Sequence, residues 1–409
     1  MSVRPIAAIV GVAFTMWAGG ARAQAPEPTP PGGAQEAEPA PAPPLPAAPV
    51  IDPDDAPEPG DQLRAIGEPE SDPSKRRYFP LNFSFLYPLA TNLGDPNRST
   101  NIDVGVVYTK VGFLNGAQTG VLAAVSHQMT GVQIGLGTVT EGRTFGAQIA
   151  GAFALSDERF DGLQVAGVFA WSRFRFNGVQ IGGVATQARK HFAGLQLAGG
   201  VNIARKTVHG VQIAGLLNIG AVEGLQLAPV NIASEVKGVQ IGLVNVARKV
   251  RGVQIGLVNI ADDVTGETIG AASVPRAGGI HGVAWGSNSL YGNFGLKFAS
   301  NFTYSIFSAS FHFERDGEDK LFAPGFTFGF FRKALLDDLY VHADVGGYRL
   351  ILMEGAQRAH DELFKTRLLL RYALAKRLSF FVGGGAYLGL RGDEPIARFG
   401  PEFDAGLEL

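Results

Sequence analysis

The chain has 409 residues, of which 28 are phenylalanine and none is cysteine. The absence of cysteine excludes disulfides, thiolate metal sites, cysteine nucleophiles and lipid attachment through cysteine. Lysine and arginine total 35 against 37 aspartates and glutamates, and this near balance does not favour a nucleic-acid partner.

The N-terminus carries the three parts of a secretory signal. Arg4 provides a positive start, an apolar stretch runs from Ile6 to Trp17, and Ala21-Arg22-Ala23 has the small-residue pattern of a cleavage site. We therefore predict a signal peptide over residues 1–23 and export from the cytoplasm. Residues 24–77 are rich in proline, alanine and acidic residues, which predicts a disordered, extended tether.

Alternating apolar residues begin close to Tyr78. Phe79, Leu81, Phe83 and Phe85 alternate with proline, asparagine and serine, which is the period-two pattern of a β-strand. We predict that the folded part of the chain is residues 78–409 and that it is all-β.

A short phrase then recurs ten times between residues 131 and 270, at steps of 14 to 16 residues. Each copy reads Gly-Val/Leu-Gln-Ile/Leu-Gly/Ala and often continues Val/Leu-Asn-Ile/Val-Ala, as in residues 252–261. Repetition on this scale is the strongest indication of architecture in the chain. The repeated glutamines are Gln133, Gln148, Gln164, Gln180, Gln196, Gln212, Gln226, Gln240 and Gln254, and the repeated asparagines are Asn202, Asn218, Asn231, Asn245 and Asn259.

Two architectures fit this repeat. In a β-barrel each copy is one strand of about ten residues, with an apolar face toward lipid and a small or polar face, bearing the glutamines and asparagines, toward the lumen. In a β-solenoid each copy is one coil, and the glutamines and asparagines stack in ladders along the axis. The solenoid accounts better for the slip in alternation between Gln240 and Asn245 and for Pro229, which cannot donate a ladder hydrogen bond.

The C-terminal strands favour the barrel. Phe364, Leu368 and Leu370 lie on one face of a predicted strand, and the opposite face is basic. The polar residues that would line a lumen are Lys365, Arg367, Arg371, His342 and Asp344. We therefore predict one antiparallel outer-membrane-type barrel over residues 78–409, with the 14–16-residue repeats as consecutive strands. The alternative is a β-solenoid repeat joined to a smaller barrel.

The repeats also resemble a known family. The Gly-Val-Gln-Ile-Gly-Leu-Val-Asn-Ile-Ala phrases, the upstream segment of residues 87–92 and the barrel-like end are similar to the surface-repeat proteins of Gram-negative bacteria. This resemblance covers about residues 78–409. It implies placement in the outer membrane or at the cell surface, and it carries over no catalytic residues.

The sequence contains no recognisable catalytic or cofactor-binding motif. The seven histidines lack metal-ligand spacing, and neither a Gly-x-Ser-x-Gly elbow nor a phosphate-binding loop occurs. We expect a non-enzymatic protein without cofactor or metal, with a structural or surface-interaction role and with outer-membrane lipids, including lipopolysaccharide, as partners. The alternative function is a passive pore, since a barrel of about 20 strands would leave an open channel.

Overall fold

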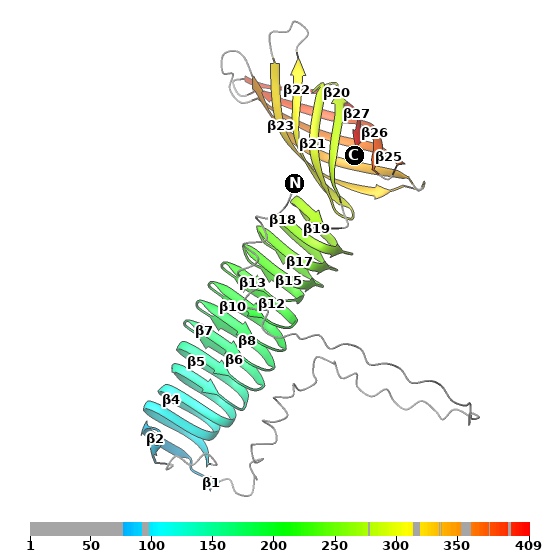
Figure 1. Ribbon diagram of the computed structural model, residues 1–409. Coiled ribbons are helices and arrows are strands. Elements are labelled where there is room, and N and C mark those ends of the chain that lie inside the picture. Colours follow the sequence, from blue (N-terminus) through cyan, green and yellow to red (C-terminus); the bar gives the residue numbers. More distant parts are fainter. Residues whose placement is uncertain are drawn as a thin grey trace, which may run out of the picture. The chain divides into compact units, whose positions relative to one another are not determined.

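The structure, a computed structural model, describes residues 77–91, 98–276, 279–313, 320–334, 336, 338–352, 361–375, 377–391 and 394–409. The predicted signal peptide and, apart from Arg77, the predicted tether lie outside these residues. Every regular element of the described residues is a β-strand, so the all-β prediction is confirmed. The strands form two sheets, one coiled and parallel in all but one strand pair, the other a closed barrel (Figure 1).

The first sheet contains nineteen strands. They are β1 (Arg77–Tyr78), β2 (Leu81–Leu86), β3 (Leu89–Ala90), β4 (Arg98–Thr140), β5 (Arg143–Ser156), β6 (Phe160–Ala166), β7 (Phe169–Ser172), β8 (Phe176–Gly182), β9 (Ala185–Ala188), β10 (Phe192–Ala198), β11 (Val201–Ala204), β12 (Val208–Ala214), β13 (Leu217–Ile219), β14 (Val222–Leu227), β15 (Val230–Val236), β16 (Val239–Ile241), β17 (Val244–Val250), β18 (Val253–Val264) and β19 (Glu267–Pro275).

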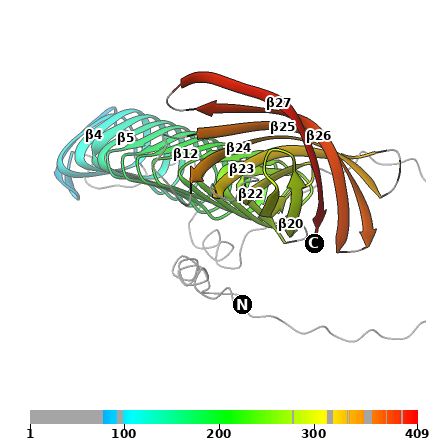
Figure 2. The same ribbon diagram turned by 90° about the horizontal axis from the view of Figure 1, so that it is seen from above.

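This sheet is a β-solenoid whose coils stack in register. Gln212 of β12 pairs with Gln196 of β10 on one side and with Gln226 of β14 on the other, and all three strands run parallel. Asn202 of β11 pairs in the same way with Asn218 of β13. Both views show the coils side by side (Figure 1, Figure 2). The prediction of one large antiparallel barrel is therefore wrong, and the alternative of a solenoid joined to a smaller barrel is confirmed.

In the coils of Gln196, Gln212, Gln226 and Gln240 the chain turns a corner between the glutamine and the asparagine, which lie on separate strands. The segment of residues 194–203 is thus two short strands rather than one long one, and the slip in alternation between Gln240 and Asn245 marks the corner. Pro229 lies at the equivalent corner between β14 and β15, where its carbonyl accepts the backbone N–H groups of Leu243 and Val244. A proline at a corner gives up no strand hydrogen bond of its own.

The first glycine of each repeat has a structural reason. At Gly210 the backbone φ is +139°, and an added Cβ would lie 2.1 Å from the carbonyl oxygen of Gly194 in the coil before. A side chain cannot occupy that space, and L-residues rarely adopt that backbone conformation. The sequence repeats glycine here because successive backbones approach this closely at the same point of every coil.

The coil becomes shorter along the solenoid. Six residues separate Gln196 from Asn202, but only five separate Gln240 from Asn245. In the longer coils Phe160, Phe176 and Phe192 stack face to face in the core, with centroids 4.9 and 5.2 Å apart. Burying each ring contributes on the order of 2 kcal/mol. In the 14-residue coils valines occupy the same row, so the smaller residues fill a narrower coil.

The second sheet is a closed antiparallel barrel of eight strands. They are β20 (Ile280–Ser287), β21 (Gly292–Ala299), β22 (Thr303–Phe313), β23 (Lys320–Lys333), β24 (Leu339–Leu352), β25 (Asp361–Ala375), β26 (Leu378–Arg391) and β27 (Glu394–Glu408). Each strand pairs with the next along the chain, and β27 pairs with β20 to complete the ring. A barrel of eight strands has an interior just wide enough for side chains to fill.

Candidate functional site

The repeated glutamines form a continuous hydrogen-bonded row inside the solenoid. All nine are fully buried. The Nε2 of each donates to the Oε1 of the glutamine one coil earlier, for example from Gln196 to Gln180 at 2.8 Å and from Gln212 to Gln196 at 2.7 Å. Because each amide is both donor and acceptor, the row satisfies these buried polar groups without water.

Asp103 sets the direction of this row. Gln118, one coil before Gln133, donates its Nε2 to Asp103 Oδ2 at 2.7 Å. An ionised carboxylate only accepts hydrogen bonds, so Gln118 must donate to it and must present its own oxygen to Gln133. Every later glutamine inherits the same orientation. At the far end Gln254 Oε1 has no hydrogen-bond partner among the described residues, and Thr268 replaces glutamine in the next coil.

Three side chains among the described residues donate hydrogen bonds to Asp103. Besides Gln118, Asn82 Nδ2 donates to its Oδ1 at 2.7 Å and Thr109 Oγ1 donates to its Oδ2 at 2.6 Å. Burial raises the pKa of Asp103 above its ordinary value, and these hydrogen bonds oppose the rise without cancelling it. The carboxyl therefore closes the N-terminal end of the polar core.

The asparagines form a second row that runs in the opposite direction. Asn202 Nδ2 donates to Asn218 Oδ1 at 2.9 Å, toward the C-terminal coils, and the same pattern continues to Asn259. Thr186 begins the row by donating to Asn202 Oδ1 at 2.5 Å, and Ser273 ends it. Since the amide dipoles of the two rows point in opposite senses, their fields partly cancel along the axis. Both rows are closed to solvent, and what they provide is coil register.

The barrel interior contains a separate set of ion pairs. Arg367 of β25 donates from Nε to Asp344 Oδ1 at 2.8 Å and from Nη1 to Asp404 Oδ1 at 3.2 Å, bridging β24 and β27. Its guanidinium lies over the ring of Trp285 at 5.3 Å. Tyr304 donates its hydroxyl to the other oxygen of Asp344 at 2.6 Å. The planar guanidinium of arginine has several N–H donors in fixed positions, which favours multidentate pairing with carboxylates.

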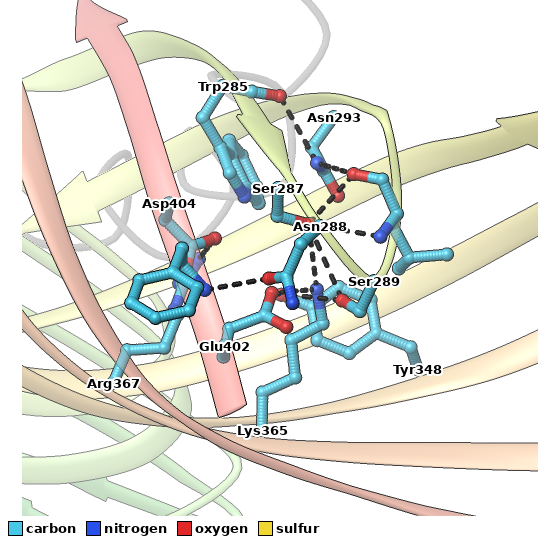
Figure 3. A network of polar contacts seen from close by, with 12 residues as sticks. Trp285, Ser287, Asn288, Ser289, Asn293, Tyr348, Lys365, Arg367, Glu402 and Asp404 are labelled. Carbon is cyan, nitrogen blue, oxygen red and sulfur yellow. Dashed lines mark hydrogen bonds and ion pairs between the residues drawn. The ribbon is translucent and has the colours of Figure 1, made fainter. Parts of the chain in front are cut away.

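Lys365 forms the next pair along the same strand (Figure 3). Its Nζ donates to Glu402 Oε1 at 2.7 Å and to Ser287 Oγ at 3.3 Å. Ser289 donates to the same Glu402 oxygen at 2.9 Å, and the ring of Tyr348 lies 5.0 Å from the ammonium. The lysine and the glutamate are both fully buried.

A third cluster surrounds Glu408. Lys297 Nζ donates to its Oε2 at 2.7 Å, and Arg371 Nη2 lies 3.0 Å from its Oε1. His342 is also buried, with its ring 5.1 Å from that of Tyr304. The cavity between these groups measures about 20 Å³, which is room for a single water.

All five polar residues that the sequence analysis assigned to a lumen point into the barrel: Lys365, Arg367, Arg371, His342 and Asp344. His342 and Asp344 do not contact each other through a hydrogen bond, so they form no acid–base pair. The acidic partners Glu402, Asp404 and Glu408 were missed, as was Lys297. A signal for them was present, because Glu402, Asp404 and Glu408 alternate with the apolar Phe403 and Leu407.

Among the described residues, no group of histidine, aspartate and glutamate side chains could hold a metal ion. The same residues contain no helix long and apolar enough to cross a membrane. Comparisons with family models, with curated proteins and with solved structures found no match for this chain.

Proposed function

We propose that the chain is a non-enzymatic protein of the outer membrane of a Gram-negative cell. Its eight-stranded barrel spans the bilayer and anchors the solenoid, which has a structural or surface-interaction role. The observation that supports this proposal is the sidedness of the barrel. Leu368 and Phe403 point outward and are 60% and 63% exposed, whereas Lys365 and Asp404 point inward and are buried.

This sidedness is reversed relative to a water-soluble fold, which places apolar residues inside and charges outside. Lipid favours the observed arrangement, because an apolar outer surface meets the acyl chains and a polar interior is shielded from them. The closed ring also leaves no strand edge unpaired, as hydrocarbon requires. Strands β22 to β27 have 11 to 15 residues, enough to cross a bilayer when tilted.

Two features of the sequence agree with this location. The predicted signal peptide would export the chain, and the resemblance to surface-repeat proteins implies the same compartment. We propose membership in that family on the repeat phrase alone. The hydrogen-bonded rows of glutamine and asparagine, which we call the amide rows, explain why these two residues recur in the phrase.

Cell fractionation tests the location. A tagged chain expressed in a Gram-negative host should appear in the outer-membrane fraction and should resist extraction by high salt. After detergent extraction its gel migration should change on boiling, as that of a folded β-barrel does. Recovery from the soluble periplasm without detergent would contradict the anchor.

A passive pore is the second candidate, and the charged interior is the observation that favours it. For ions to pass, the Arg367 and Lys365 pairs would have to separate, because the gap of about 20 Å³ beside them does not admit a hydrated solute. Purified protein in a planar bilayer should then show brief conductance steps that change after charge reversal at Lys365. A silent bilayer containing folded protein would favour the anchor without transport.

A further inference from the structure

The outward positions of the solenoid are aliphatic on two of its sides. Every glutamine of the inner row from Gln133 to Gln254 is flanked on both sides by valine, leucine, isoleucine or alanine, and so is every asparagine from Asn202 to Asn259. Leu195 and Leu197, for example, flank Gln196, and neither is buried. Since side chains alternate along a strand, these flanking residues face away from the core. We call the two surfaces they form the aliphatic faces.

The two aliphatic faces meet at the corner between glutamine and asparagine, and this corner is apolar as well. Val168, Val184, Leu216, Leu243 and Leu257 occupy this position in five of seven consecutive coils and are 48% to 63% exposed, and Gly200 and Pro229 occupy it in the other two. Backbone hydrogen bonds link the corner residues of adjacent coils, as from the N–H of Val184 to the carbonyl of Val168. We call this row the apolar ridge.

All charged residues of the repeat region up to Asp263 lie at the opposite side of the coil. Between residues 141 and 263 there are twelve lysines and arginines against eight aspartates and glutamates, and each of them lies one to five residues before the first glycine of a repeat. Some are paired across coils: Lys237 donates to Glu223, which lowers the pKa of Glu223, and Arg251 lies 3.0 Å from Glu235. We call this side the charged edge.

The two aliphatic faces are large enough to indicate that a partner covers them. With coils about 4.8 Å apart, the nine glutamine coils extend one aliphatic face over about 40 Å, and the five asparagine coils extend the other over about 20 Å. Each face is one short strand wide, roughly 13 Å at four residues, so the two faces together present about 750 Å². Water-soluble monomers rarely expose apolar patches of more than a few hundred Å². The glutamines and asparagines meanwhile lie inside and bond to one another in their two rows, so these two sides of the solenoid are apolar outside and polar within.

Lipid matches this surface better than a second copy of the chain does. The apolar surface continues around the ridge over both faces, and a copy packed on one face would leave the other in water. The charged edge has a basic excess, which suits anionic head groups. Trp171 and Phe174 lie beside this edge, Phe174 with Lys190 Nζ 4.4 Å from its ring centre, and aromatic residues favour that depth of a bilayer.

We propose that the solenoid lies in the surface of an anionic lipid leaflet, with the apolar ridge among the acyl chains and the charged edge at the head groups. This extends the proposed function: the barrel would hold the chain at the bilayer, and the solenoid would make a second, lateral lipid contact. The amide rows make such a position tolerable, because they leave few polar groups of the coil in need of water.

The chain has no cysteine, so single cysteines can report on each surface of the full-length protein. Leu216→Cys places a fluorophore on the apolar ridge, Arg205→Cys places one on the charged edge, and Leu368→Cys places one on the outside of the barrel. Each labelled protein is reconstituted in vesicles of phosphatidylethanolamine and phosphatidylglycerol. Quenching is then measured with nitroxide on the acyl chains and with iodide in the water.

The proposal predicts that the Leu216 and Leu368 labels are blue-shifted and quenched several-fold more by the acyl-chain nitroxide than by iodide, with the reverse at Arg205. Quenching of the Leu216 label by nitroxide should fall in vesicles of phosphatidylcholine alone, and equal quenching there would overturn the anionic preference. If iodide reaches Leu216 while nitroxide still quenches Leu368, the lateral contact is refuted and the barrel anchor stands. If iodide reaches both labels, the proposed function fails as well. If Leu216 is shielded from both quenchers and its self-quenching is relieved by unlabelled protein, copies of the chain cover the ridge and the lipid proposal is wrong.

Discussion

Replacing Gln196 by leucine breaks the glutamine row at one point while nearly preserving side-chain volume. The change removes the bonds to Gln180 at 2.8 Å and from Gln212 at 2.7 Å. It leaves Gln180 Oε1 and Gln212 Nε2 buried without a partner, and each such group costs about 1–3 kcal/mol. The solenoid should therefore lose about 2–6 kcal/mol of stability, a large part of what a folded domain has in reserve.

Urea unfolding followed by the fluorescence of Trp171 measures this loss. Trp17→Phe and Trp285→Phe make Trp171 the only tryptophan, so the signal reports on the solenoid alone. Gln187→Leu is the matched control, because Gln187 has an outward position and is not buried, and it should change stability by no more than about 0.5 kcal/mol. If Gln196→Leu and the control shift the urea midpoint equally, the amide row does not hold the coils together.

Three further substitutions test other parts of the structure. Asp103→Asn keeps the side-chain shape but turns an amide toward donors such as Gln118. The urea midpoint should therefore fall by the equivalent of about 1–3 kcal/mol. An unchanged midpoint would show that the glutamine row does not depend on a carboxylate at its end. Gly210→Ala brings a Cβ within 2.1 Å of the Gly194 carbonyl and should cost more than about 1 kcal/mol in the same assay; a neutral result would mean that the coils are not this close. Arg367→Met removes the ion-pair partner of two buried aspartates and should destabilise the barrel by about 3–5 kcal/mol. The folded gel band should then be lost at a lower temperature. An unchanged temperature would mean that these interior ion pairs do not form in lipid.

The sequence predicted the strands and their inner faces well, but it did not decide how consecutive strands pair. Alternation around Gln212 is the same whether its neighbour Gln226 lies parallel beside it in the next coil or belongs to an antiparallel hairpin. The information that decided the matter was small: one step out of phase between Gln240 and Asn245, together with Pro229. The long, regular strands of the C-terminal part are typical of a barrel, and this is correct for β20 to β27. The same architecture is wrong for the repeats, which form a solenoid.

The sequence predicted which side chains face the interior of the barrel, but it did not predict which of them form ion pairs with one another. Alternation along β25 places Lys365, Arg367 and Arg371 on the side opposite Leu368. Their partners come from elsewhere in the chain, with Asp404 lying 37 residues from Arg367. Arg367 lies on β25 and Asp404 on β27, with β26 and its glycines Gly383 and Gly385 between them, so sequence spacing carries no direct signal of this pair.

The central claim, that the barrel lies in a bilayer with its polar face inward, is tested most directly by a nitroxide scan along β25. Single cysteines at the outward Leu368 and Leu370 and at the inward Leu363 and Leu369 would be spin-labelled in the full-length protein in lipid vesicles. These residues are 60%, 49%, 6% and 5% exposed. Outward labels should collide freely with lipid-soluble oxygen and hardly at all with a water-soluble nickel chelate, whereas inward labels should collide little with either. If the nickel chelate reaches Leu368 and Leu370 as readily as oxygen does, the barrel faces water and the account is wrong.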